Sequence, residues 1–200
     1  PPEELRGAMI SWHERVVTEV EEGGKLTRSQ EGVYMRLTTR LLMLGRSGSI
    51  LSAEERHGLA AQCRRMLAAG TSNLRYSATG LLGAVGDEAD DGEHLVALLR
   101  DSQSNVRSEA ALALGRSFPQ TRGKNLAKLV GMLGDSEEQV RANALYALWR
   151  EHEPGKAHNM FFMTGTFEEQ KAATLAWLKE HRGIEPAQAG AKGADDAPAR

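Results

Sequence analysis

The sequence predicts an all-α fold, a right-handed α-α superhelix of about four to five stacked helix pairs. Three observations lead to this fold class. Aromatic residues make up only 5% of the chain and hydrophobic residues 40%, a balance that favours close-packed helices over sheets. Apolar residues recur with the spacing of one helix face. A short motif built around an arginine returns three times along the chain.

The arginine motif marks the second helix of each predicted pair. Its copies are segments 73–78, 105–110 and 139–144. They contain Arg75, Arg107 and Arg141 at matching positions, 32 and 34 residues apart. Apolar residues lie one before, three after and seven after each arginine, which places them on one face of a helix.

The stretch before each motif predicts the first helix of the pair. Three apolar residues correspond from copy to copy: Cys63, Met66 and Leu67; Leu95, Leu98 and Leu99; and Leu129, Met132 and Leu133. Short polar turns that contain Asp101 and Asp135 join the two helices and supply candidate N-caps for the second. Because one such pair cannot bury its apolar face alone, neighbouring pairs have to stack.

The N-terminal flank predicts a further pair. The quartet Leu-Gly-Arg-Ser occurs at 44–47 and again at 114–117, two repeats later. This echo predicts a second helix over about residues 30 to 45 and a first helix over about residues 3 to 21. One face of that first helix carries Leu5, Met9, Trp12, Val16 and Val20.

The C-terminal flank predicts a last helix and then a tail. Capping boxes at Ser52–Glu55 and Thr166–Glu169 open two helices, the second reaching about residue 181. Ala172, Leu175, Ala176 and Leu178 are expected to point inward from it. Residues 1–183 are thus expected to form one helical repeat domain, clearest over 55–152. Residues 184–200 are rich in Ala, Gly, Pro and charged residues and are expected to be flexible.

Residues 106–115, Val-Arg-Ser-Glu-Ala-Ala-Leu-Ala-Leu-Gly, resemble the second-helix signature of the HEAT-repeat family. The closest similarity is to the bacterial repeats of the phycobilisome-lyase type. The resemblance covers about residues 55 to 152 and rests on three consecutive copies.

The resemblance implies a ladder of ion pairs between adjacent repeats. An aspartate stands six residues before two of the motif arginines. The implied ladder residues are Arg75, Asp101, Arg107, Asp135 and Arg141. The first unit departs from the pattern because Ala69 takes the place of the aspartate.

Metal catalysis is not expected. In the deoxyhypusine hydroxylases, which are similar arrays, His-Glu pairs directly follow the Val-Arg of the second helices and hold two irons. Here those places carry Tyr76-Ser77, Ser108-Glu109 and Ala142-Asn143. The His-Glu pairs at 13–14 and 152–153 lie elsewhere and far apart, and are expected to be surface histidines. No metal or cofactor is predicted.

Nucleic-acid binding is not expected either. The alkylpurine DNA glycosylases with this type of fold need a basic concave groove with aromatic residues and a catalytic carboxylate. The net charge of this chain is −2, and the residues expected on the concave face are mixed in character. No Gly-rich phosphate loop, nucleophile elbow or Ser/His/Asp arrangement occurs in the sequence.

Two of three further features have competing interpretations. The acidic run 87–93 is expected to be a solvated loop in which Asp90 and Glu93 cap the next helix, or else a docking site for a basic partner. The cluster at 158–163, with Met160 to Met163 at its centre, either plugs the last repeats or forms an exposed docking patch. Cys63 is expected to be a buried small hydrophobe, and as the only cysteine it forms no intrachain disulfide.

The function expected from these observations is a non-catalytic scaffold that binds a protein or peptide on the concave face formed by the second helices. The residues expected to contact the partner are Tyr76, Ser108, Glu109, Leu112, Asn143, Tyr146 and Arg150. One alternative is a regulatory or lyase-associated subunit acting on a bilin-carrying or enzyme partner. Another is a DNA-binding protein of the alkylpurine glycosylase kind.

The compartment and the oligomeric state stay open. A single cysteine fits the cytoplasm but also allows the periplasm. No apolar run approaches the roughly 20 residues that span a bilayer, so direct membrane insertion is not expected. The chain begins Pro1-Pro2 without Met, which leaves an upstream signal or anchor open.

Overall fold

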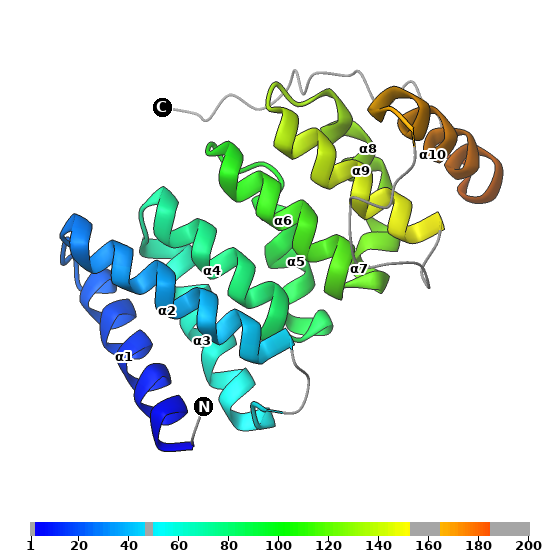
Figure 1. Ribbon diagram of the computed structural model, residues 1–200. Helices are drawn as coiled ribbons and strands as arrows, with labels where there is room; N and C mark the ends of the chain where they lie inside the picture. Colours follow the sequence, from blue (N-terminus) through cyan, green and yellow to red (C-terminus); the bar gives the residue numbers. More distant parts are fainter. Residues whose placement is uncertain (1–2, 47–49, 153–164, 185–200) are drawn as a thin grey trace.

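The computed structural model describes residues 3–46, 50–152 and 165–184. All regular secondary structure in these ranges is helical, so the predicted all-α solenoid is confirmed (Figure 1). The first three pairs are α1 (Glu3–Glu21) with α2 (Arg28–Arg46), α3 (Ala53–Ala69) with α4 (Ser72–Val85), and α5 (Glu88–Leu98) with α6 (Ser104–Ser117). They are followed by α7 (Pro119–Lys124), α8 (Leu126–Gly131), the short 3₁₀ helix η1 (Met132–Gly134), α9 (Glu138–His152) and α10 (Phe167–Arg182).

Capping residues set several helix starts. Both predicted capping boxes are present, with Ser52 and Glu55 opening α3 and Thr166 and Glu169 opening α10. A third one was missed. The Thr27 N–H donates to Gln30 Oε1 at 2.8 Å, and the Gln30 N–H donates to Thr27 Oγ1 at 3.3 Å. This reciprocal pair starts α2 two residues before the predicted helix.

The acidic run is not the loop that the sequence suggested. It forms the first turns of α5, and the N-cap is Asp87, whose carboxylate accepts a hydrogen bond from the Ala89 N–H at 2.8 Å. Asp90 and Glu93 are exposed. Asp91 is buried and accepts from Arg64 Nη1 at 2.6 Å and from the Asp87 N–H at 2.9 Å. The run therefore anchors α5 on α3.

The first helix of the third arginine unit is broken where a continuous helix was expected. Pro119 starts α7, and Asn125 separates α7 from α8 with φ −117° and ψ 22°. The Asn125 side-chain amide donates to the Thr121 carbonyl at 3.0 Å and so competes with the helical hydrogen-bond pattern.

The helices form two layers. The second helices α2, α4, α6 and α9 pack directly on one another in sequence, as Figure 1 shows, whereas α3 and α5 are not in such close contact. Glycines at one repeat position allow this approach: Gly45, Gly83 and Gly115 each follow the repeated leucine. Because the second helices approach more closely than the first, the array curves with the second-helix layer on its inner side, and we call that side the concave face.

The core lies between the layers and contains the repeated apolar positions. Leu82, Leu114 and Leu148 have no exposed surface, as their spacing predicted. Cys63 is also completely buried, which confirms its prediction, and burial raises the pKa of its thiol.

The end helices bury less than predicted. Leu5 is 53% exposed, although Met9, Val16 and Val20 on the same face are buried. In α10, Leu175 and Leu178 are buried as expected, but Ala172 and Ala176 are exposed. An end helix packs on one side only, and α10 packs on α9, so the predicted inward stripe was too wide.

The prediction of a surface histidine at position 13 is wrong. His13 has no exposed surface and lies where α1, α2 and α3 meet. Its Nδ1 is 2.6 Å from Gln62 Oε1, and its Nε2 is 3.0 Å from the Tyr34 hydroxyl. Because an amide oxygen only accepts, Nδ1 carries the proton and Nε2 accepts from Tyr34. Burial lowers the pKa of His13 to about 4, although the bond to Gln62 and the nearby Glu14 act in the other direction.

Acidification from pH 7.5 to 5 is expected to cost this array about 2 kcal/mol of folding free energy at His13. The unfolded imidazole, with a pKa near 6.5, gains a proton in this range, while the folded imidazole stays neutral until about pH 4. The stabilisation is thus complete above pH 6.5 and is lost as the pH falls toward 4. Urea unfolding at both pH values measures the loss, and His13→Gln should reduce it.

The matched control is His94→Gln, because His94 is exposed on α5. Its loss between pH 7.5 and 5 should equal that of the unmodified chain. If His13→Gln loses as much folding free energy between pH 7.5 and 5 as the unmodified chain, His13 is not the titrating group.

Some predictions concern residues outside the described ranges. They are the cluster at 158–163, Glu153 of the second His-Glu pair, and all of the predicted tail except Ile184. None of the described helices is both long enough and apolar enough to cross a membrane.

Candidate binding groove on the concave face

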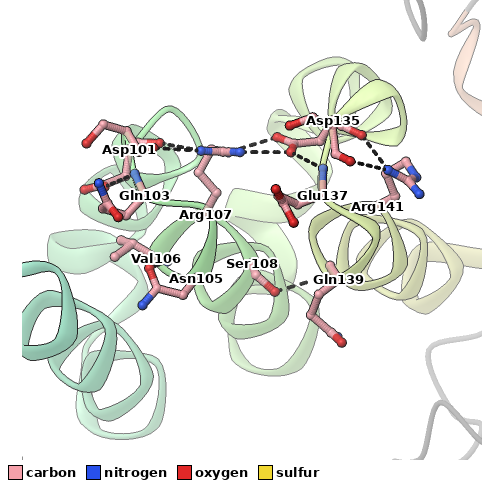
Figure 2. A network of polar contacts seen from close by, with 12 residues as sticks. Asp101, Gln103, Asn105, Val106, Arg107, Ser108, Asp135, Glu137, Gln139 and Arg141 are labelled. Carbon is pink, nitrogen blue, oxygen red and sulfur yellow. Dashed lines mark hydrogen bonds and ion pairs between the residues drawn. The ribbon is translucent and has the colours of Figure 1, made fainter.

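Arg107 joins two neighbouring helix pairs. Its Nε donates to Asp135 Oδ2 and its Nη2 to Asp135 Oδ1, both at 2.9 Å (Figure 2). Its remaining nitrogen, Nη1, donates to the carbonyls of Asp101 and Ser102 at 2.9 and 3.3 Å. One guanidinium thus holds the turn before its own helix and the turn of the next repeat.

The other two motif arginines repeat parts of this geometry. Arg75 donates to both carboxylate oxygens of Asp101, at 3.1 and 3.0 Å, and to the Gly70 carbonyl at 3.1 Å. Arg141 donates to the carbonyls of Asp135 and Ser136 at 2.8 and 3.0 Å (Figure 2). The aspartate of each repeat therefore pairs with the arginine of the preceding one.

This direction of pairing explains the departure at Ala69. An aspartate at position 69 would pair with an arginine in α2. The Leu-Gly-Arg-Ser echo aligns Leu37 with Arg107, so α2 has no such arginine. The aspartate at position 69 and its arginine partner at position 37 are therefore both absent.

The ladder changes the acidity of its carboxyl groups. Partial burial acts to raise the pKa of Asp135, but the bonds from Arg107 and from the Glu137 N–H outweigh it and hold the pKa below its usual range. The same balance holds at Asp101, with Arg75 and the Gln103 N–H as donors.

Three adjoining depressions form a groove on the concave face. One, of about 390 Å³, lies over α4, α6 and α9, and Tyr76, Ser108, Glu109, Leu112 and Asn143 are among the residues lining it. A second, of about 230 Å³, shares Tyr76, Glu109 and Leu112 with the first and reaches α2. A third, of about 440 Å³, shares Arg46 and Arg116 with the second and also contacts Tyr146 and Arg150. We call these three depressions together the concave groove.

The structure brings all seven predicted contact residues to this groove, but with different access to solvent. Tyr76 is 36% exposed, and Glu109, Leu112 and Arg150 are half-buried. Tyr146 is only 1% exposed and contributes mainly to the core.

Ser108 and Asn143 join two repeats at the groove floor. They are 6% and 3% exposed. The Asn143 amide donates to the Ser108 carbonyl at 3.0 Å and to Ser108 Oγ at 2.9 Å. These polar atoms are thus committed to linking α6 with α9, and Tyr76, Glu109 and Leu112 remain the accessible part of the predicted set near them.

Glu109 is the central acidic group of the groove. A methyl group added at Gly80 would lie 2.9 Å from Glu109 Oε1, so the carboxylate lies directly over the α4 backbone. Burial raises the pKa of Glu109, and the nearby guanidinium groups of Arg116 and Arg46 oppose this rise. Gly80 therefore makes room for an accessible, partly desolvated carboxylate.

Arg46 and Arg116 are among the groove residues that sequence reasoning missed. They are the third residues of the two Leu-Gly-Arg-Ser quartets, which served only to align the repeats. The signal that they share one face was therefore present. In the three described ranges, no group of three His, Cys, Asp or Glu side chains is placed to hold a metal ion.

Comparison with known protein families gives a match to part of the chain. Residues 63–149 match the family model of HEAT repeats, and these residues contain all three arginine motifs. No curated protein and no solved structure matches the chain significantly. The finer resemblance to the phycobilisome-lyase type stays a prediction. The match, the stacked helix pairs and the Arg-Asp ladder together identify residues 63–149 as HEAT repeats.

Proposed function

We propose that this chain is a non-catalytic scaffold that binds an extended segment of a partner protein in the concave groove. HEAT repeats are commonly protein-interaction scaffolds. The observation that carries the proposal for this chain is the groove itself, which crosses α2, α4, α6 and α9 and is lined by the aromatic Tyr76, the aliphatic Leu112 and the charged Glu109.

The size of the groove fits a short peptide. Neighbouring packed helices lie about 8–10 Å apart, so four second helices span about 25–30 Å. An extended chain advances about 3.3 Å per residue, so roughly eight residues would cross all four helices. The rigid helical layer holds the contact residues in place, which lowers the entropy lost on binding.

The chemistry of the groove also favours recognition. The ring of Tyr76 presents apolar surface and a hydroxyl, a combination common among residues that dominate binding energy. Leu112 adds apolar surface beside it, and Glu109 is partly desolvated. A carboxylate in such surroundings forms a strong bond with a donor of the partner.

Removing the Tyr76 ring and the Glu109 charge together should weaken partner binding at least tenfold. The change is Tyr76→Ala together with Glu109→Gln, which deletes the exposed ring and the charge while keeping the size of residue 109. The partner is first identified by affinity purification with mass spectrometry from the native cell. Its dissociation constant is then measured by calorimetry with the purified proteins.

The control carries changes of the same kind outside the groove. Glu93 is exposed on α5 and His57 is exposed on α3, so Glu93→Gln with His57→Ala should leave the affinity unchanged. A thermal unfolding midpoint equal to that of the unmodified chain shows that the fold of each variant is intact. Unchanged affinity in the Tyr76 and Glu109 variant would move the binding site away from the groove.

A further inference from the structure

Arginines from three second helices line one end of the concave groove. Arg46 ends α2, Arg116 lies in the last turn of α6, and Arg150 comes from α9. All three line the depression of about 440 Å³, with Gly45 and Ala84 among its other residues. We call this depression the arginine pocket.

The repeat register explains how they meet. Each of these arginines stands two residues after the repeated leucine of its helix, namely Leu44, Leu114 and Leu148. Equivalent positions of stacked helices form a column across the concave face. In α4 the same position is Ala84, and its short side chain leaves open the space that a fourth arginine would fill.

In the described part of the chain Arg46 and Arg116 form no ion pair, although the charge of Glu109 acts on both from nearby. The ladder arginines differ in this respect, since Arg75 and Arg107 each form an ion pair with an aspartate. Burial lowers the pKa of Arg46, and the positive charge of Arg116 lowers it further, while Glu109 and Tyr146 act in the opposite direction. Two exposed guanidinium groups thus repel each other at the pocket, Glu109 offsets part of this repulsion, and an anion between them would relieve the rest.

The backbone supports both cations but leaves their donors free for a ligand. A helix C-terminus carries partial negative charge, which stabilises a cation in the last turn. A guanidinium presents several N–H donors in a planar fork that matches a carboxylate. The arginine pocket therefore has the chemistry of an anion site.

We propose that the arginine pocket binds an acidic side chain, Asp or Glu, of the partner segment that lies in the concave groove. This inference rests on the proposed function and specifies the charge of one part of the partner. The groove favours a protein over a nucleic acid, because Glu109 lies next to the pocket and would repel the next phosphate of a strand. An acidic residue followed by neutral or basic residues fits both charges.

The test uses the full chain and a short acidic probe, acetyl-triglutamate amide. Binding is followed by NMR through the Nε–Hε signals of the arginines at low ionic strength. Saturable shifts are expected at Arg46 and Arg116, and acetyl-triglutamine amide should cause none. Arg46→Gln with Arg116→Gln should weaken probe binding at least tenfold. Arg100→Gln should leave it unchanged, because Arg100 is exposed in the turn before α6, at the other end of that helix.

Three results would overturn the proposal, the last of them obtained with inorganic phosphate. One is equal probe binding in the double variant and the unmodified chain. A second is tighter binding of hexathymidylate than of triglutamate at the same salt concentration, which would make the pocket a nucleic-acid phosphate site. Inorganic phosphate serves to measure the affinity for a free anion, and an affinity above that of triglutamate also counts against a carboxylate site.

The identified partner separates this proposal from the scaffold function. A loss of partner affinity in both the Tyr76 and Glu109 variant and the arginine variant supports both proposals. A loss only in the Tyr76 and Glu109 variant leaves the scaffold function standing and removes the acidic contact. Triglutamate binding without any effect of the Tyr76 and Glu109 variant on the partner refutes the scaffold site while the pocket remains.

Discussion

Arg107→Ala is expected to lower the free energy of unfolding by about 3 kcal/mol, the largest effect of any single ladder residue. The change removes two bonds to Asp135 and two bonds to the carbonyls of Asp101 and Ser102. It also leaves the Asp135 carboxylate, 14% exposed, without its guanidinium partner. Urea unfolding followed by circular dichroism measures the loss.

Arg141→Ala is the matched comparison within the ladder. Arg141 bonds the carbonyls of its own turn but has no ion pair with an aspartate in the described part of the chain. Its removal should cost about 1 kcal/mol, a third of the effect at Arg107. A double-mutant cycle between Arg107→Ala and Asp135→Ala should give a coupling of at least about 1 kcal/mol. Equal losses at Arg107 and Arg141 would contradict the inter-repeat role of the ion pair.

Gly83→Ala is expected to destabilise the protein by about 2 kcal/mol, although alanine is the better helix former. An added methyl group at Gly83 would lie 2.5 Å from the Ala113 Cβ and 3.3 Å from the Ala113 Cα. These atoms belong to α6, so α4 and α6 would have to move apart. Thermal unfolding and urea unfolding both report the loss.

Gly58→Ala supplies the opposite expectation at a helical glycine with open space. Nothing lies within 4 Å of a methyl group built at Gly58 in α3. The substitution should stabilise the protein by about 0.5–1 kcal/mol, since alanine loses less backbone entropy than glycine in a helix. An increase in the free energy of unfolding in both Gly58→Ala and Gly83→Ala would show that α4 and α6 do not need a glycine to approach each other.

The repeats explain how much of the fold the sequence could predict. The helix limits of α1, the capping boxes at Ser52 and Thr166, and the buried Leu82, Leu114 and Leu148 all follow from spacing along one helix. The resemblance to HEAT repeats implied ladder contacts, and the structure has Arg75 and Arg107 paired with Asp101 and Asp135. Features of this kind depend on the order of residues within one helix. Because the motif is repeated, a prediction made for one copy can be checked against the other copies.

The candidate groove was only partly accessible to the same reasoning. The three arginine motifs placed Tyr76, Glu109 and Leu112 on one face, and the structure gathers them in one groove. Spacing along a helix states the side on which a residue lies. It does not state how closely the next helix packs there, so the burial of Ser108, Asn143 and Tyr146 was not foreseen.

Apart from the break between α7 and α8, the sequence by itself determined the helix pairs and the column of arginines and leucines, because these are properties of one chain segment or of its repetition. Only the tertiary structure decided which polar groups are buried and which charges meet. His13 is buried because α2 and α3 supply Tyr34 and Gln62 as partners for its imidazole. Arg46 and Arg116 form a pocket because glycines let α2, α4 and α6 pack closely and because Ala84 leaves the space between them open. Contacts between residues far apart in the chain depend on helix separation, and the pattern along one helix does not contain that distance.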